Sequence, residues 1–169
     1  MRKLSLVAFI PLMFSVCACN ASDAVLTEIP VADGISLIFE ETQFEKNTDK
    51  PTDCDNGYIC LVNNQPLWGA DGKMPKTKLK KAQVVIKGIK ADLDTSGMYD
   101  PMVSVDRKSH YVVLHYYGDT WKVRGRFSDG AGAYYAEWLV TKGGAIRVMI
   151  GDTELLYDAF DSFFSQGIK

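Results

Sequence analysis

Histidine is scarce in this chain of 169 residues, in which only His110 and His115 occur. Of the four cysteines, Cys17 and Cys19 lie in the first twenty residues. A zinc centre, which needs four ligands, and a triad built on a histidine base therefore have few residues to draw on. The sequence also contains no G-x-S-x-G, H-E-x-x-H, P-loop or Rossmann fingerprint. We assign no catalytic residue, no metal ligand and no cofactor from the sequence.

A strong net charge is also missing, because 19 Lys and Arg stand against 21 Asp and Glu. Nothing in this balance indicates a nucleic-acid surface, so we expect no nucleic-acid partner. The only long apolar run lies at the start of the chain, which excludes a polytopic membrane protein. The length suits one domain rather than two.

The first residues predict export. Arg2 and Lys3 precede an apolar segment at 4–16, interrupted by Pro11, and small residues follow. A membrane-spanning helix needs about 20 apolar residues, so this segment is too short to be one. We expect residues 1–18 to be a signal peptide and the mature protein to be periplasmic or attached to the cell envelope.

Two processing routes are open. Residues 16–19 resemble a bacterial lipobox, which predicts lipidation of Cys19 and attachment to the outer membrane through a lipid anchor. The alternative is ordinary cleavage near Ala18 or Ala21, which releases a soluble protein. Removal of the two N-terminal cations with the signal changes the net charge from −2 to −4. We expect residues 19–33 to be a linker, within which 24–29 could be an edge strand, and 34–169 to be a single compact β-rich domain.

Cys54 and Cys60 remain in the folded part, and in an exported chain they predict a local disulfide. Asn56-Gly57 lies between them, and this pair favours the chain reversal that brings the thiols together. The alternatives are a redox pair, whose usual spacing is C-x-x-C, and a zinc site, for which further ligands are missing.

The hydrophobic pattern predicts several β-strands. We expect strands at residues 35–39, 58–62, 82–89 and 102–105, with surface loops at 45–55 and 69–75. Glu40-Glu41 should end the first of these strands. Four lysines, Lys76, Lys78, Lys80 and Lys81, indicate a solvated sheet edge or, alternatively, a docking patch for an anion.

The second half carries the clearest signals. Strands at 110–117, 121–127, 134–140 and 146–150, separated by glycine-containing turns, predict a four-stranded antiparallel meander. The pattern then changes to helical spacing after Asp152 and Thr153, with an apolar stripe of Leu155, Leu156, Ala159, Phe160, Phe163 and Phe164. The expected fold is mainly β (α+β): an antiparallel, sandwich-like β-domain with one C-terminal amphipathic helix.

Few polar residues are placed for catalysis. His110 and His115 lie five apart on one expected strand, so they point to opposite faces. Asp92 and Asp94 would share a face if that segment is extended. These four residues support one alternative function, a hydrolase that acts on envelope material.

The most unusual segment is the small-residue loop Ser128–Ala133 between two aromatic strands. Small residues allow close approach of another chain, and Tyr gives contact area at low entropic cost. The alternative is an ordinary wide hairpin loop. The predicted partner-binding residues are Arg124, Arg126, Ser128, Asp129, Gly130, Tyr134, Tyr135 and Glu137.

These observations favour a binding protein over an enzyme. We expect an exported envelope protein with a protein partner, most specifically an inhibitor or immunity protein that blocks a toxin enzyme by contact. The envelope hydrolase and a structural lipoprotein without a catalytic partner remain alternatives.

Overall fold

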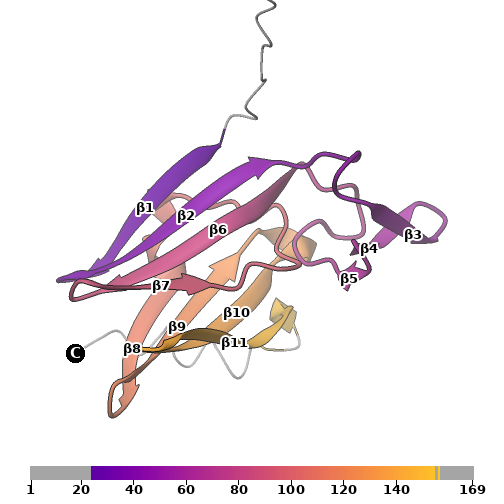
Figure 1. Cartoon of the computed structure of the whole chain (residues 1–169). Coiled ribbons are helices and arrows are strands. Elements are labelled where there is room, and N and C mark those ends of the chain that lie inside the picture. Colours follow the sequence, from indigo (N-terminus) through magenta and orange to yellow (C-terminus); the bar gives the residue numbers. More distant parts are fainter. Residues whose placement is uncertain (1–23, 155, 157–169) are drawn as a thin grey trace, which may run out of the picture.

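The protein is mainly β, and its strands form three antiparallel sheets (Figure 1). The computed structural model describes residues 24–154 and 156. The first sheet has the order β1-β2-β6-β7, with β1 at Val25–Ala32, β2 at Ile35–Gln43, β6 at Thr77–Ile86 and β7 at Ile89–Leu93. The second has the order β11-β10-β9-β8, with β8 at Tyr111–Tyr117, β9 at Thr120–Phe127, β10 at Tyr134–Thr141 and β11 at Gly144–Asp152. The third, smaller sheet contains β3 at Pro51–Asp55, β4 at Tyr58–Val62 and β5 at Gln65–Pro66.

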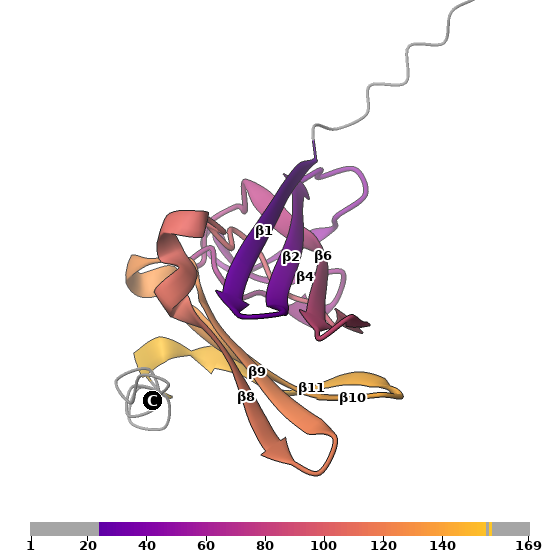
Figure 2. The ribbon, with the colours of Figure 1, turned by 90° about the vertical axis from the view of Figure 1, so that its left-hand side faces the viewer.

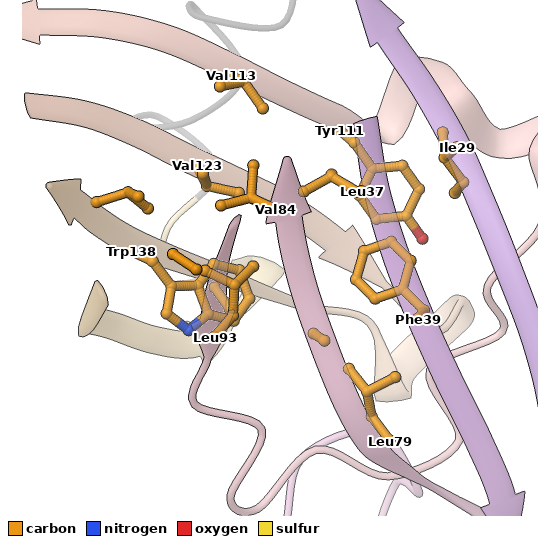
Figure 3. Close-up of a cluster of buried hydrophobic side chains, with 14 of the residues drawn as sticks. Ile29, Leu37, Phe39, Leu79, Val84, Leu93, Tyr111, Val113, Val123 and Trp138 are labelled. Carbon is orange, nitrogen blue, oxygen red and sulfur yellow. The ribbon is translucent and has the colours of Figure 1, made fainter. Parts of the chain in front are cut away.

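The core lies between the two larger sheets, which form two layers in Figure 2. Alternate residues of each strand point inward, as the two-residue period of a β-strand requires. Leu37 and Val84 come from the first sheet, whereas Val123 and Trp138 come from the second, and all four are almost completely buried (Figure 3). Phe39 contacts Tyr111 and Phe127 across the interface, at ring-centroid distances of 5.3 and 5.9 Å. The inward-facing aromatic rings therefore hold the two sheets together.

The predicted meander is confirmed. Strands β8 to β11 pair in chain order, and β8 turns into β9 at Gly118-Asp119 as expected. Strand β4 occupies the predicted residues 58–62. These segments have strong β-propensity and clear turn signals, so local sequence and tertiary structure agree.

The start of the first sheet extends beyond the expected strands. Residues 25–32, left between linker and edge strand by the sequence, form the edge strand β1, whose register shifts between Pro30 and Ala32. Glu40-Glu41 does not end β2, which runs on to Gln43 through an irregularity at these two residues. Lys80 lies 2.9 Å from the Glu40 carboxylate, so cross-strand ion pairing lets charged residues continue the strand.

The structure at residues 76–94 differs in part from the expectation. Lys78, Lys80 and Lys81 lie in the first half of β6, which pairs with β2 on one side. On the other side β7 pairs only with residues 82–86, and beyond it the described residues form one bridge, between Lys78 and Tyr99. The expected strand 82–89 is in fact the end of β6 and the start of β7, joined by a tight turn at Lys87-Gly88. Both turn residues have positive φ, 48° and 87°. Lysine at the first turn position conceals the turn in the sequence, since Asn or Asp is the usual signal there.

Two further segments differ from the expectations. Residues 45–55 are not wholly a loop, because β3 begins at Pro51. The expected strand 102–105 is absent: Met102 has φ 51°, and a short 3-10 helix, η1, runs from Val105 to His110. Ser104 accepts a hydrogen bond from the amide of Asp106 and so caps this helix, which explains why the apolar residues nearby do not extend.

The predicted C-terminal helix falls mostly outside the described residues. Within them, β11 ends at Asp152 and helical conformation follows at Thr153 and Glu154. Asp152 accepts a hydrogen bond from the amide of Glu154 at 2.7 Å. Asp152 is one of the two residues expected as the cap, and the helix that it would begin lies mostly outside the described residues.

Candidate functional site

A groove of about 590 Å³ opens where three loops meet at one end of the two large sheets. We call it the loop groove. Its lining residues are 69–71, 73–74, 76–77, 100, 102 and 128–132. The last of these segments is most of the small-residue loop that the sequence singled out, and it contains a short 3-10 turn, η2, at Gly130–Gly132.

The loop groove is surrounded by strained backbone. Asp71, Asp100, Met102 and Ser128 have φ values of 48°, 39°, 51° and 60°, in the left-handed region that L-residues avoid. Among the described residues, the other non-glycine positions with positive φ are Asn56, Asn63, Asn64 and Lys87, which lie in turns. Such conformations persist only where the surrounding contacts dictate them, and they concentrate at functional sites.

Hydrogen bonds on the floor of the groove hold this strained backbone. The Asp100 carboxylate accepts from the backbone amides of Lys76 and Thr77, both at 2.8 Å. The amide of Ser128 donates to Pro101 O at 2.9 Å, and its hydroxyl donates to Gly69 O, also at 2.9 Å. These contacts tie the three loops to one another, so the groove has a fixed shape.

Two glycines let the loop backbones approach closely. A Cβ at Gly69 would lie 1.8 Å from Tyr99 O, and a Cβ at Gly132 would lie 2.5 Å from Gly69 O. Neither position accommodates a side chain without movement of backbone. Packing therefore explains Gly132 of the predicted loop, whereas the positive φ of Gly130, 52°, fits the turn geometry of an ordinary hairpin loop.

Charged groups of both signs line the rim. Asp71, Lys73, Lys76 and Asp129 are exposed, and the Met102 side chain, 42% exposed, adds an apolar surface. Arg107 donates to Ser128 O at 3.0 Å and lies 3.6 Å from the Asp129 carboxylate. A mixed rim around an apolar patch suits a protein surface better than a single small charged ligand.

The structure divides the predicted partner-binding residues into three groups. Ser128, Asp129 and Gly130 line the loop groove. Tyr134 is fully buried in the core between the sheets, where its ring stacks on Phe127.

The third group lies on the outer face of the second sheet. Arg124, Arg126, Tyr135 and Glu137 alternate with the inward-facing residues of β9 and β10. Arg124 and Glu137 form a buried ion pair, and Tyr135 is 2% exposed. Leu156, which follows β11, lies against Gly151 on this same face. The 128–132 loop therefore lies on a different surface from these four side chains.

The residues of the hydrolase alternative do not form one constellation. His115 contacts Gly118 O at 2.6 Å and the Trp121 ring at the end of the β8–β9 hairpin. Asp92, on β7, accepts a hydrogen bond from Gln83 at 2.6 Å. Asp94 pairs with Arg147 at 3.2 Å on the second sheet.

Asp94 and His110 have shifted pKa values. Burial acts to raise the pKa of Asp94, but hydrogen bonds from Ser96 and the charge of Arg147 outweigh it, so the pKa is lowered. His110 lies in η1 rather than on the expected strand. Partial burial, with the charges of Arg126 and Arg107, lowers its pKa. Its buried Nδ1 has no hydrogen-bond partner within the described residues. Both shifts have local structural causes.

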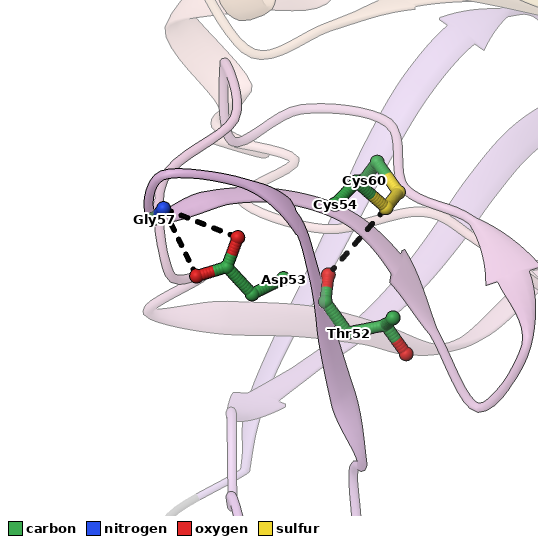
Figure 4. Close-up of a disulfide and its surroundings, with 5 residues drawn as sticks. All are labelled: Thr52, Asp53, Cys54, Gly57 and Cys60. Carbon is green, nitrogen blue, oxygen red and sulfur yellow. Dashed lines mark hydrogen bonds between the residues drawn. A yellow bond between two sulfur atoms is a disulfide. The ribbon is translucent and has the colours of Figure 1, made fainter.

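The predicted disulfide between Cys54 and Cys60 is confirmed and links β3 to β4 (Figure 4). The Asp53 carboxylate accepts a hydrogen bond from the amide of Gly57 at 2.9 Å, so a residue of the same hairpin stabilises the turn between the cysteines. The Cys54 side chain is exposed, and the pair lies in the small third sheet, away from the main core.

Sequence reasoning missed the part of the loop groove that lies outside the 128–132 loop, including Asp71, Asp100 and Met102. Asp71, Asp100 and Met102 are far from the 128–132 loop in sequence, and only the tertiary structure brings them to it. Asp71-Gly72 and Asp100-Pro101 were available as turn signals, but a turn signal does not say which loops meet.

In the part of the chain that the structure describes, no group of three or more His, Cys, Asp or Glu side chains could hold a metal ion. Over the same residues, no helix is long and apolar enough to cross a membrane. No protein-family model matches this chain, and neither the curated proteins nor the solved structures give a significant match.

Proposed function

We propose that this chain is an exported binding protein of the bacterial cell envelope that inhibits an enzyme, most specifically as an immunity protein against an enzyme toxin. The observation that carries the proposal is the loop groove. Four non-glycine residues from three separate loops adopt left-handed backbone around it, and hydrogen bonds fix each loop to the next. A fixed surface loses little conformational entropy when a protein partner binds.

In this proposal the 128–132 loop contacts the partner directly. Asp129, Gly130 and Ala131 are its exposed residues. Arg107 holds the start of the loop by donating a hydrogen bond to Ser128 O. The signal peptide and lipidation of Cys19 belong to the same proposal, since they would place the protein where an envelope enzyme acts. A partly apolar surface with a charged rim is the general composition of such contacts.

The test uses a variant that fills the groove without touching its supports. Ala131 is exposed, so Ala131→Arg should leave the free energy of unfolding within about 0.5 kcal/mol of the wild type. The matched control is Ala32→Arg, an exposed alanine at the β1–β2 turn. The full chain is first cross-linked in its native envelope, and the enzyme attached to it is purified.

Inhibition of that enzyme is then titrated with each variant. The proposal expects stoichiometric inhibition by the wild type and by Ala32→Arg, and at least about a tenfold weaker inhibition by folded Ala131→Arg. Full inhibition by Ala131→Arg would move the contact elsewhere. Hydrolysis of envelope material by the purified chain itself, lost when Asp92 and Asp94 are replaced, would favour the hydrolase alternative instead.

A further inference from the structure

The outer face of the second sheet is buried more deeply than a sheet surface that faces water. Figure 2 shows the first sheet on one side of the second sheet, and no described strand lies on the opposite side. Tyr135, Arg124 and Glu137 point to that opposite side, yet their exposed fractions are only 2%, 6% and 6%. The strands of one sheet cannot cover their own face to this extent, so the burial requires a further layer.

The outer face of the first sheet provides a comparison within the same molecule. Ser36, Ile38, Gln83 and Val85 occupy the corresponding outward positions on the central strands β2 and β6. All four are half-buried, as expected where neighbouring side chains are the only cover. The three buried residues of the second sheet therefore have a cover that the first sheet lacks.

The covered part of the face lies beside the end of β11. Tyr135 pairs with Gly151 in the register of β10 and β11, and a Cβ at Gly151 would lie 3.0 Å from the Leu156 side chain. The chain therefore turns back onto this face directly after its last strand. Towards the β10–β11 turn, Ile146 is 64% exposed, so the cover ends before it reaches that turn.

The chain that follows Leu156 is long enough to supply the cover. Residues 157–169 lie outside the described part of the structure. Thirteen residues of α-helix extend about 20 Å, whereas three strand spacings, from β11 to β8, measure about 14 Å. A helix that continues from Leu156 can therefore cross the whole buried patch.

An apolar side of this segment matches apolar residues of the face. Phe160, Phe163 and Phe164 recur at helical spacing after Leu156, so a helix presents them on one side. Half-buried apolar side chains lie around the buried patch: Val112, Leu114, Leu139 and Met149. Contact between the two sets removes apolar surface of both from water.

The charges of the face and of the segment are opposite. The outward residues of β9 include three cations: Lys122, Arg124 and Arg126. Glu137 of β10 lies among them and forms the ion pair with Arg124. Residues 157–169 contain Asp158 and Asp161 against one lysine, Lys169. A net basic face attracts a net acidic segment, and the two aspartates stay in water because they lie off the apolar side.

We propose that residues 157–169 form an amphipathic helix that packs in cis on the outer face of the second sheet and covers the Arg124–Glu137 ion pair. A hydrogen-bonded ion pair tolerates an apolar cover, whereas a single buried charge does not. The cover closes this face to other proteins and leaves the loop groove open. The inference does not depend on the proposed function.

The experiment places photoreactive p-benzoylphenylalanine at residue 112 of the purified full chain. Val112 points to the outer face from β8, at the opposite edge of the sheet from β11, so only a segment that crosses the sheet reaches it. The matched position is Ile38, half-buried on the outer face of the first sheet. After irradiation, mass spectrometry of the monomer should find adducts with residues 157–169 from position 112 and none from position 38.

Two single substitutions test which side of the segment makes the contact. Phe160→Asp puts a charge on the apolar side and should lower the yield of the adduct at least about tenfold, because the buried ring is lost. Ser165→Asp puts the same charge on the opposite side of the helix and should leave the yield unchanged. Circular dichroism should report the same β-sheet content for both variants, since neither position belongs to the core between the sheets.

The accessibility of Arg124 gives a second measurement. Phenylglyoxal modifies accessible arginines, and Arg126, which is half-buried, provides the internal reference. Relative to Arg126, Arg124 should react slowly in the wild type and in Ser165→Asp, and clearly faster in Phe160→Asp. This readout concerns a residue outside the loop groove, so Ala131→Arg should not change it.

Several results would overturn the proposal. These are the absence of adducts with residues 157–169 from position 112, equal adducts from positions 112 and 38, and an unchanged yield in Phe160→Asp. Adducts that join two chains would assign the face to a second copy instead. Equal loss in Phe160→Asp and Ser165→Asp would also contradict an amphipathic helix.

Discussion

At the scale of single residues, two buried hydroxyl groups, those of Thr42 and Tyr111, have no hydrogen-bond partner within the described residues. The Tyr111 side chain is buried against Phe39, and its oxygen has no hydrogen-bond partner within the described residues. Burial raises the pKa of this phenol, so the group stays neutral at ordinary pH. A buried hydroxyl without a hydrogen-bond partner lowers the free energy of unfolding, because its desolvation is not compensated.

Tyr111→Phe should therefore increase the free energy of unfolding, by about 1 kcal/mol, because it removes the unsatisfied oxygen and keeps the ring. Tyr134→Phe is the matched control, since the Tyr134 hydroxyl donates to Tyr99 O at 3.5 Å. We expect no gain from the control. Urea unfolding measures both values, and a loss of stability in Tyr111→Phe would show that the oxygen has a partner.

His110 makes stability depend on pH. Its pKa is lowered in the folded chain by burial and by Arg126 and Arg107, whereas in the unfolded chain it is about 6.5. Below that value the unfolded chain binds a proton that the folded chain resists. The free energy of unfolding should therefore fall as the pH drops below about 6.5, until the folded pKa is reached.

His110→Gln removes this proton binding from both states. Between pH 7 and pH 5 the variant should lose less stability than the wild type, while the two should have parallel profiles from pH 7 to pH 8. His115→Gln serves as the control, because its ring is exposed at the hairpin tip. Identical pH profiles for His110→Gln and the wild type would exclude His110 as the source.

At the scale of elements, agreement between sequence and structure follows from how local the signals are. The meander was predictable because each strand of β8–β11 pairs with its neighbour in the chain and each turn has a glycine. The first sheet was harder to predict, because β2 pairs with β6 and the strands of the small third sheet lie between them in the sequence. Glu40 and Glu41 look like a strand end until their partners are known, and Lys80 is contributed by a distant segment.

The candidate site shows the same division. Ser128, Asp129 and Gly130 were found from the sequence because small residues cluster there. Asp100 was not found, since its role as acceptor for two backbone amides of residues 76–77 depends on a contact between distant loops. Tyr135 was selected for its aromatic ring alone, and the period of β10 places that ring on another face.

The β6–β7 turn offers a direct test of turn chemistry. Lys87 and Gly88 both have positive φ, a conformation that favours Asn-Gly. Lys87→Asn should therefore raise the free energy of unfolding by about 0.5–1 kcal/mol. The matched control is Lys90→Asn, also exposed but within β7, which should be neutral or slightly destabilising. Thermal and urea unfolding of both variants check the expectation, and equal effects at the two positions would contradict it.

At the scale of the whole molecule, the chain consists of a large body and a small attached sheet. The main core includes residues of both large sheets, but Ile59 and Val62 of β4 are buried outside it. Cys54 and Cys60 cross-link the small sheet to itself rather than to the body. The disulfide therefore stabilises mainly by restricting the unfolded chain.

Replacement of both cysteines by serine should lower the free energy of unfolding by about 2 kcal/mol, since the closed loop is short. The unfolding transition should stay cooperative, because the core of the two large sheets is unchanged. The wild type in the presence of a reductant provides the control, and it should lose the same amount. A loss of more than about 4 kcal/mol would contradict this expectation and show that the small sheet contributes to the main cooperative unit.

The irregularity in β1 has a consequence for behaviour in concentrated solution. Pro30 has no N–H to offer to another strand, and the register shift between Pro30 and Ala32 disrupts the outer edge of the first sheet. At the edge of the second sheet, β11 contains no proline and leaves Ile146 and Val148 exposed. Aggregation by strand addition is thus blocked on one side of the molecule, and a charged substitution at Ile146 would be the simplest way to improve solubility on the other.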